Sequence, residues 1–206
     1  MKVVIVTAPM MNPKGLEPKV YPIDGNSDIK YDEPVLCPIN AILAEKLGKD
    51  EEVKVIYITI LENIKCEQNI ENFTSELNGI NKDIGAKLSY DTVEIPFEPT
   101  KQTYNKLITD LAEKIPENAE IYTDITYSYK PAILSLFCAL RFVEEFRNAV
   151  IQYIVYGKVE FDDDNKPQNP KLFDITSLYY LFKLMGTMGA VSAETAAETL
   201  KKFFEM

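Results

Sequence analysis

The sequence predicts an α/β protein with a Rossmann-like, open and mainly parallel six-stranded sheet flanked by helices. Short apolar runs rich in Val, Ile and Tyr alternate along the chain with longer stretches that have the apolar spacing of helices. The runs lack strict apolar–polar alternation, which is typical of parallel strands that helices cover on both faces. Strand–helix–strand repeats of this kind form a layered sheet with right-handed crossovers.

Five of the apolar runs are the expected parallel strands, and a sixth strand completes the sheet. A polar turn rich in Asp, Asn and Pro separates the last two strands, so these two are expected to form a β-hairpin near the C-terminal end. The expected strands are residues 2–8, 52–60, 87–97, 119–126, 149–157 and 171–176.

Helix signals lie between and after these strands. Thr100 is a candidate N-cap, and Pro131 stands at the expected first position of the fourth helix, where its missing N–H costs least. Ser192, three residues before Thr195, is part of a capping pattern for the last helix. The expected helices are residues 39–47, 67–87, 101–115 and 131–146, one that begins at Ser177, and residues 192–206.

Composition and charge limit the classes of ligand that the protein can bind. The 206 residues, 46% hydrophobic and 26% charged, are enough for one globular domain with a small appendage. The 32 acidic and 22 basic residues give a net charge of −10, which argues against a broad surface for duplex nucleic acid. A single small anion remains compatible, because it needs only a few local donors and a helix N-terminus.

Histidine is absent, and the three cysteines (Cys37, Cys66 and Cys138) are far apart in the sequence. This pattern disfavours a zinc site and a histidine-activated nucleophile, and it is typical of free thiols in a reducing compartment. The N-terminus carries no signal-peptide pattern, and the apolar run at 178–191 is short and contains Lys183. We therefore expect a cytoplasmic protein that uses no metal or cofactor and has no membrane association.

Two strand ends are candidate ligand sites, because open parallel sheets bind ligands beyond the carboxyl ends of their strands. The first is Thr7, followed by Ala8, Met10 and a long connection to Pro38 that is rich in Pro, Asn, Asp and Gly. Long connections are often functional, so this one either covers a ligand or is a plain surface loop.

The second candidate lies in YTDITYSYKPAILSLF, residues 122–137. Asp124 and Thr126 share a face of an extended chain. Lys130 follows at the positive end of a helix dipole, where an ammonium group and free N–H groups attract an anion. The other interpretation is that Asp124 caps the turn, the tyrosines pack and Lys130 is solvated. The turn between strand and helix is Tyr127, Ser128 and Tyr129.

Three segments resemble the CARF domains (CRISPR-associated Rossmann fold) of type III CRISPR ancillary proteins: DITYSYKPAILSLF, IQYIVYGKVEF and KLFDITSLYYLFKLM. The resemblance covers residues 1–188 in element order and is specific from Asp124 onward. It departs from the family pattern at Tyr127 and Ser128, where relatives often have His-Gly or Gly-Gly. Residues 189–206 would be a dimer element or a connector to an effector domain outside this chain.

The resemblance implies a homodimer that binds cyclic oligoadenylate, a tetra- or hexa-adenylate ring, in a two-fold symmetric pocket. The hydroxyls of Thr7 and Thr126 would contact phosphate or ribose, Lys130 would meet a phosphate, and Tyr127 and Tyr129 would stack on adenine. The full set of expected ligand-binding residues is Thr7, Ala8, Met10, Asp124, Thr126, Tyr127, Ser128, Tyr129 and Lys130.

Other functions stay open. Some CARF proteins are ring nucleases, in which a ribose 2′-OH attacks the neighbouring phosphate without a metal; Lys130 and Thr7 would be the catalytic residues here. A Rossmann-like enzyme acting on a nucleotide is another possibility, although the chain has no GxGxxG or GxxxxGK[ST] motif. A transcription regulator whose DNA-binding part lies elsewhere is the third. Sensing of the ring is favoured over its cleavage.

Overall fold

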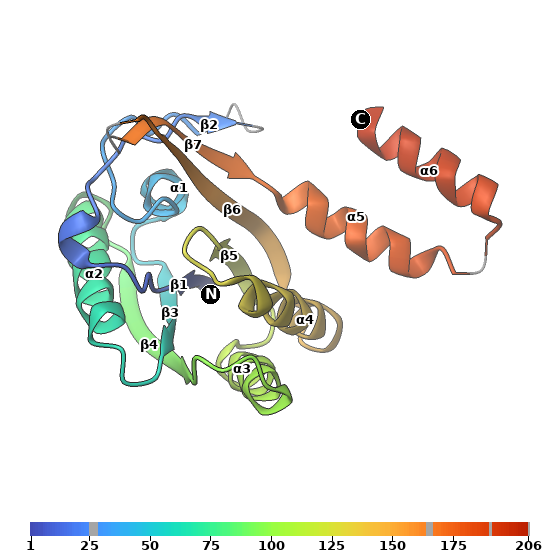
Figure 1. Cartoon of the computed structure of the whole chain (residues 1–206), viewed down its shortest axis with the longest axis horizontal. Coiled ribbons are helices and arrows are strands. Elements are labelled where there is room, and N and C mark those ends of the chain that lie inside the picture. The colour runs from blue at the N-terminus through green and yellow to red at the C-terminus, as the bar shows by residue number, and fades with distance from the viewer. Residues whose placement is uncertain (25–28, 164–166, 190, 206) are drawn as a thin grey trace.

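The protein is an α/β sandwich built on one seven-stranded, mostly parallel sheet, as the computed structural model shows (Figure 1). The structure describes residues 1–24, 29–163, 167–189 and 191–205. The predicted fold class is confirmed, and the sheet has one strand more than the six expected.

The strand order across the sheet is β2-β7-β6-β5-β1-β3-β4. Neighbouring strands are parallel except for β6 and β7, which form the expected antiparallel hairpin. The strands are β1 (Lys2–Thr7), β2 (Ile23–Asp24), β3 (Glu52–Ile60), β4 (Lys87–Ile95), β5 (Glu120–Asp124), β6 (Val150–Phe161) and β7 (Pro167–Asp174).

The additional strand is β2, which lies within the long connection after β1. Its two residues pair with Leu172 and Phe173 of β7, and the Leu172 N–H donates to the Pro22 carbonyl over 3.0 Å. Two residues are too short for any periodic pattern, so the strand exists only because β7 offers it a free edge. The hairpin is also longer than expected, because its polar residues continue the pairing beyond Gly157.

Helices cover both faces of the sheet (Figure 1). α1 and α2 pack on the face that carries Val4 and Val6, and α3 and α4 pack on the face that carries Val3 and Ile5. α5 and α6 follow the sheet. The helices are α1 (Asn40–Lys46), α2 (Ile64–Ile84), α3 (Lys101–Lys114), α4 (Lys130–Phe146), α5 (Thr176–Thr187) and α6 (Ala193–Glu205), with a 3-10 turn, η1 (Pro13–Gly15).

Capping side chains fix several helix starts. The Thr100 hydroxyl accepts from the Thr103 N–H over 3.2 Å, and the Ser192 hydroxyl accepts from the Thr195 N–H over 3.3 Å, as predicted for both. α2 begins earlier than predicted because Asn63 caps it. Pro131 is the second residue of α4, since the helix already begins at Lys130.

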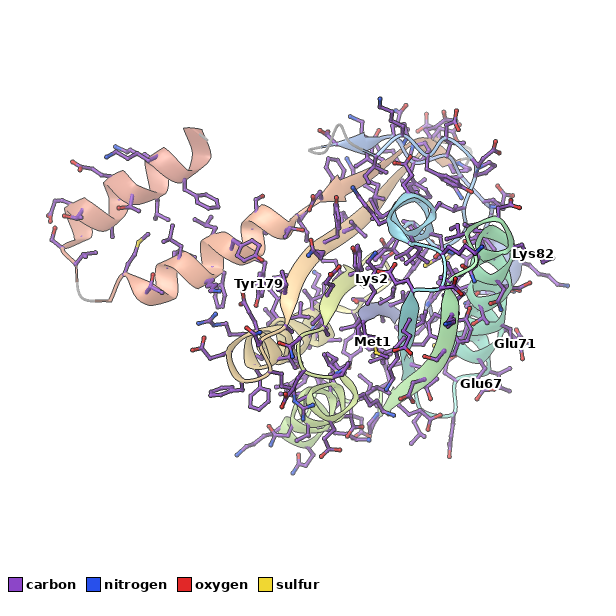
Figure 2. All side chains as sticks on the ribbon, turned by 180° about the vertical axis from the view of Figure 1, so that it is seen from behind. Met1, Lys2, Glu67, Glu71, Lys82 and Tyr179 are labelled. Carbon is purple, nitrogen blue, oxygen red and sulfur yellow. The ribbon has the colours of Figure 1, made fainter. Side chains whose placement is uncertain are left out.

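α5 and α6 form a helical arm that extends away from the sheet (Figure 1). Figure 2, a view from behind, shows Tyr179 where α5 meets the rest of the protein. Tyr179 is buried, and its hydroxyl donates to the Glu144 carboxylate of α4 over 2.9 Å. Lys183 reaches the same carboxylate over 2.7 Å. Among the described residues, no helix has the length and apolar character to cross a lipid bilayer.

Candidate functional site

The ends of β1 and β5 meet at the point where the strand order reverses. After β1 the chain places the two-residue β2 at the far edge of the sheet, then adds β3 and β4 on one side of β1, and finally returns to place β5 on the other side. Such a switch point opens a crevice at the carboxyl ends of the strands, where ligands of open α/β sheets bind. Here Thr7 and Ser128 join the two ends through a hydrogen bond of 2.6 Å between their hydroxyls. The two segments predicted from the sequence therefore belong to one location.

Asp124 lies inside the protein beneath this edge. Its Oδ1 accepts from the Thr126 N–H over 2.8 Å, and its Oδ2 accepts from the Ile39 N–H over 3.0 Å. Burial raises the pKa of Asp124, although the hydrogen bonds from Thr126 and Ile39 act to lower it. Asp124 is 1% exposed and links the turn to the start of α1. This agrees with the interpretation in which Asp124 caps the turn.

Thr126 is packed tightly against β6. Its hydroxyl accepts from the Gly157 N–H over 2.7 Å, and its own backbone N–H donates to Asp124. A Cβ at position 157 would lie 2.9 Å from Pro38 Cγ and 3.1 Å from Thr126 Oγ1, which only a glycine avoids. The Thr126 hydroxyl therefore holds the turn in place, and Gly157 allows the close approach.

The two tyrosines of the turn are half-buried. The Tyr127 ring lies 5.9 Å from that of Phe73, and its hydroxyl donates to the Leu36 carbonyl over 3.3 Å. Burial raises the pKa of Tyr127 far above its usual range. The Tyr129 ring meets Phe97 edge-on at 5.6 Å, and within the described part of the chain its buried hydroxyl has no hydrogen-bond partner. Each ring already has an aromatic neighbour from another part of the chain, Phe73 being buried and Phe97 exposed.

Lys130 is exposed at the first residue of α4. Its ammonium group and the unpaired N–H groups of the first helical turn produce a positive potential there. Lys130 also borders a cavity of 460 Å³ between α3 and α4. The other residues that line this cavity are Tyr104, Ile108, Pro131, Leu134, Ser135 and Cys138.

A second cavity, of 430 Å³, lies between the turn, β6 and the long connection after β1. The connection supplies Lys19, the nearby Glu17 and apolar wall residues, and Tyr156 of β6 adds a ring that is 41% exposed. The long connection therefore walls a pocket. The lining residues are Met11, Gly15, Leu16, Glu17, Lys19, Tyr21, Thr126, Tyr127, Tyr156, Gly157, Val159 and Pro167.

Lys19 and Tyr156 were missed by the sequence analysis. No sequence pattern pairs a residue in an irregular connection with one on a strand more than a hundred positions later. Tyr156 stands within an apolar run and was interpreted as part of a covered strand. In the structure it is 41% exposed and lines the second cavity.

α2 anchors the start of the connection. The Asn69 side-chain amide donates to the carbonyls of Pro9 and Met11 over 2.8 and 3.0 Å. Ala8 is buried, and Met10 is half-buried against the core. Ala8 and Met10 therefore support the edge mainly by packing and backbone contacts.

α2 also anchors the end of the connection. The Glu76 carboxylate accepts from the N–H groups of Leu36 and Cys37 over 2.6 and 3.1 Å, and from the Asn40 amide over 2.7 Å. Burial raises the pKa of Glu76, against the effect of these hydrogen bonds. The walls of the second cavity are thus fixed at both ends by one helix.

A comparison of the chain with models of known protein families finds no match, and a search of curated proteins finds none either. In residues 1–24, 29–163, 167–189 and 191–205, no three acidic or cysteine side chains gather in a way that would hold a metal ion. The groups at the edge that suit a ligand are Lys130, the N-terminus of α4 and the half-buried tyrosines of the turn, while Lys19 and the exposed Tyr156 line the separate second cavity. This set fits an anion that carries planar rings.

Proposed function

We propose that this protein is a cyclic oligoadenylate-binding sensor domain of a type III CRISPR antiviral system, and that it binds the ring between two copies. The observation that supports this most directly is the junction at the strand switch point. There Thr7 bonds to Ser128, and Lys130 begins α4 two residues further on. This arrangement directs a cation and a helix N-terminus toward the place where open sheets bind ligands.

The charge of the chain is compatible with an anionic ligand. A net charge of −10 disfavours a long polyanion that covers much of the surface. A compact ring needs only a local positive field, which Lys130 and the N-terminus of α4 provide. Tyr156 offers an exposed ring for stacking on a base, in addition to the tyrosines of the turn.

Two copies of the chain would suit the symmetry of the ligand. A ring of four or six identical nucleotides has a two-fold axis, and a homodimer presents each contact twice about such an axis. The chain would then bind the ring with two Lys130 residues and two α4 N-termini.

Sensing is favoured over cleavage. A ring nuclease would need a group placed against the reacting phosphate, and Thr7 was the candidate beside Lys130. Thr7 is buried, and its hydroxyl is already bonded to Ser128, which leaves Lys130 as the accessible group. One cation supports ground-state binding without supplying the transition-state contacts that cleavage requires.

Calorimetry with cyclic tetra- and hexa-adenylate tests the proposal. Lys130→Ala should weaken binding about tenfold or more, since a charged hydrogen bond contributes about 1.5–3 kcal/mol. The melting temperature should hardly change, because Lys130 lies outside the core. Chromatography of the same mixtures reports whether the ring is cut.

Lys101→Ala is the matched control, because Lys101 is an exposed lysine at the first residue of the neighbouring helix α3. Its ring affinity should equal that of the wild type. If neither ring binds, or if Lys130→Ala binds as well as the wild type, the proposed function is wrong.

A further inference from the structure

The 460 Å³ cavity beside Lys130 lies between α3 and α4, two helices that pack side by side (Figure 1). We call it the α3–α4 groove. Tyr104 and Ile108, four residues apart, line it from α3, while Lys130, Leu134 and Cys138 line it from α4 at the same spacing. From Lys130 to Cys138 the groove follows α4 for about 12 Å. An ammonium group therefore stands at one end of the groove and a thiol at the other.

The groove is apolar between these two ends. Leu134 is 70% exposed, and Ile108 and Pro131 add further apolar surface. Ser135 also lines the groove, but it is buried, and its hydroxyl already donates to the Pro131 carbonyl over 3.3 Å. The volume lies in the range of small-molecule sites, which are mostly apolar and contain few polar groups. The groove therefore suits the apolar body of a small ligand.

The charge at the end of the groove is positive and unpaired. No acidic residue lines the groove with Lys130, and within the described part of the chain the Lys130 ammonium makes no ion pair. The second cavity, in contrast, has Glu17 in its wall. Arg141 and Lys183 line a cavity between α4 and α5, but both pair with Glu144, over 3.2 and 2.7 Å. The α3–α4 groove thus combines apolar walls with a cation that is free to bind an anion.

We propose that the α3–α4 groove binds a small acidic amphiphile, whose acidic group meets Lys130 and whose apolar chain lies between Ile108 and Leu134. A nucleobase would fit this groove less well, because its polar edges need hydrogen-bond partners and the groove offers few. The inference does not rest on the proposed function, which concerns a nucleotide ring at the carboxyl edge of the sheet. The two ligands would share only Lys130.

Cys138 makes the test specific to the groove, because it is exposed while Cys37 and Cys66 are buried. N-ethylmaleimide, a small uncharged reagent, should label the full chain at Cys138. Decanoate is the probe, since it joins a carboxylate to an extended apolar chain. Saturating decanoate should slow the labelling about fivefold or more, because its chain covers the thiol. If decanoate does not bind in calorimetry, or binds without slowing the labelling, the inference is wrong.

Two analogues separate the acidic group from the chain. Propionate keeps the carboxylate and lacks most of the chain, whereas decanol keeps the chain and lacks the charge. Each should bind about tenfold or more weakly than decanoate, because each loses one of the two contacts. Decanol that binds as well as decanoate would show that the groove does not recognise an acid. Propionate that binds as well would show that the apolar walls contribute nothing, and either result contradicts the proposal.

Substitutions test the wall and the cation. Leu134→Glu places a negative charge inside the groove and should weaken decanoate binding about tenfold or more. Its control is Leu178→Glu, because Leu178 is 55% exposed on α5 and does not line the groove. Lys130→Ala should weaken decanoate binding about tenfold and leave decanol binding unchanged, while Lys101→Ala should bind both like the wild type. Normal decanoate affinity in Leu134→Glu or in Lys130→Ala would place the ligand elsewhere and overturn the inference.

This inference and the proposed function fail separately. A chain that binds neither adenylate ring, but whose Cys138 is protected by decanoate, keeps the amphiphile site and rejects the ring. A chain that binds a ring and ignores decanoate does the reverse. If cyclic tetra-adenylate itself slows the labelling of Cys138, and Leu134→Glu removes that protection, the groove belongs to the ring site and the amphiphile is rejected.

Discussion

At the scale of single residues, the carboxylate of Asp124 is the group with the greatest effect on how the candidate site is held. It accepts hydrogen bonds from the N–H groups of Ile39, which lies 85 positions earlier in the sequence, and of Thr126, which lies two positions later. The carboxylate faces inward, so it stabilises the edge without presenting a negative charge to an anionic ligand.

Asp124→Ala should lower the free energy of unfolding by about 2–4 kcal/mol. The substitution leaves two buried N–H groups without partners, and each such group costs about 1–3 kcal/mol. Urea unfolding of the two proteins measures the difference. Glu71→Ala is the control, because Glu71 lies on the outer face of α2 (Figure 2) and should change stability by less than about 0.5 kcal/mol. Unchanged stability together with lost ring binding would show that Asp124 contacts the ligand.

At the scale of elements, the junction of α4 and α5 depends on Glu144. Burial acts to raise the pKa of Glu144, but the hydrogen bonds from Lys183 and Tyr179 outweigh it, and the pKa is lowered. Because the folded pKa lies below the unfolded value, the unfolded chain takes up this proton first as the pH falls. The contribution of Glu144 is therefore present at neutral pH and is lost as the pH falls through the folded pKa.

Glu144→Gln should cost about 1–2 kcal/mol of stability at pH 7, since it weakens charged hydrogen bonds to α5. The difference from the wild type should shrink as the pH falls below about 4.3, the ordinary pKa of glutamate. Denaturant unfolding at a series of pH values measures this. Glu145→Gln, on the exposed side of the same helix, should show almost no such dependence. A difference that stays constant across this range would contradict the assignment.

The elements that could be predicted from the sequence are those with a local pattern. The apolar runs identified β1, β3, β4, β5 and β6, and the apolar spacing with capping residues identified the helices that cover them. β2 could not be predicted, because its two residues gain strand structure only from the edge of β7. The length of the β6–β7 hairpin was likewise decided by pairing between polar residues.

The features of the candidate site also divide into those that could be predicted from the sequence and those that only the structure reveals. Thr7 and the turn after β5 were each predicted as candidate ligand sites at strand ends, and the bond between Thr7 and Ser128 shows that the two lie together. The inward direction of Asp124 depends on Ile39, and the cavity that Tyr156 lines depends on the long connection after β1. Such partners are distant in sequence, so only the folded chain reveals them.

At the scale of the whole molecule, the proposed dimer and the proposed ligand respond to salt in opposite directions. Two copies with a net charge of −10 each repel at long range. Raising the salt from about 0.01 M to about 1 M shortens the screening length from about 30 Å to about 3 Å. The repulsion between the two copies then falls.

Dimerisation should therefore strengthen as salt is added, whereas ring affinity should fall, because Lys130 and the α4 N-terminus attract phosphates electrostatically. Sedimentation velocity without ligand gives the first slope, and calorimetry with the ring gives the second. A dimer that dissociates as salt rises would mean that ion pairs join the copies.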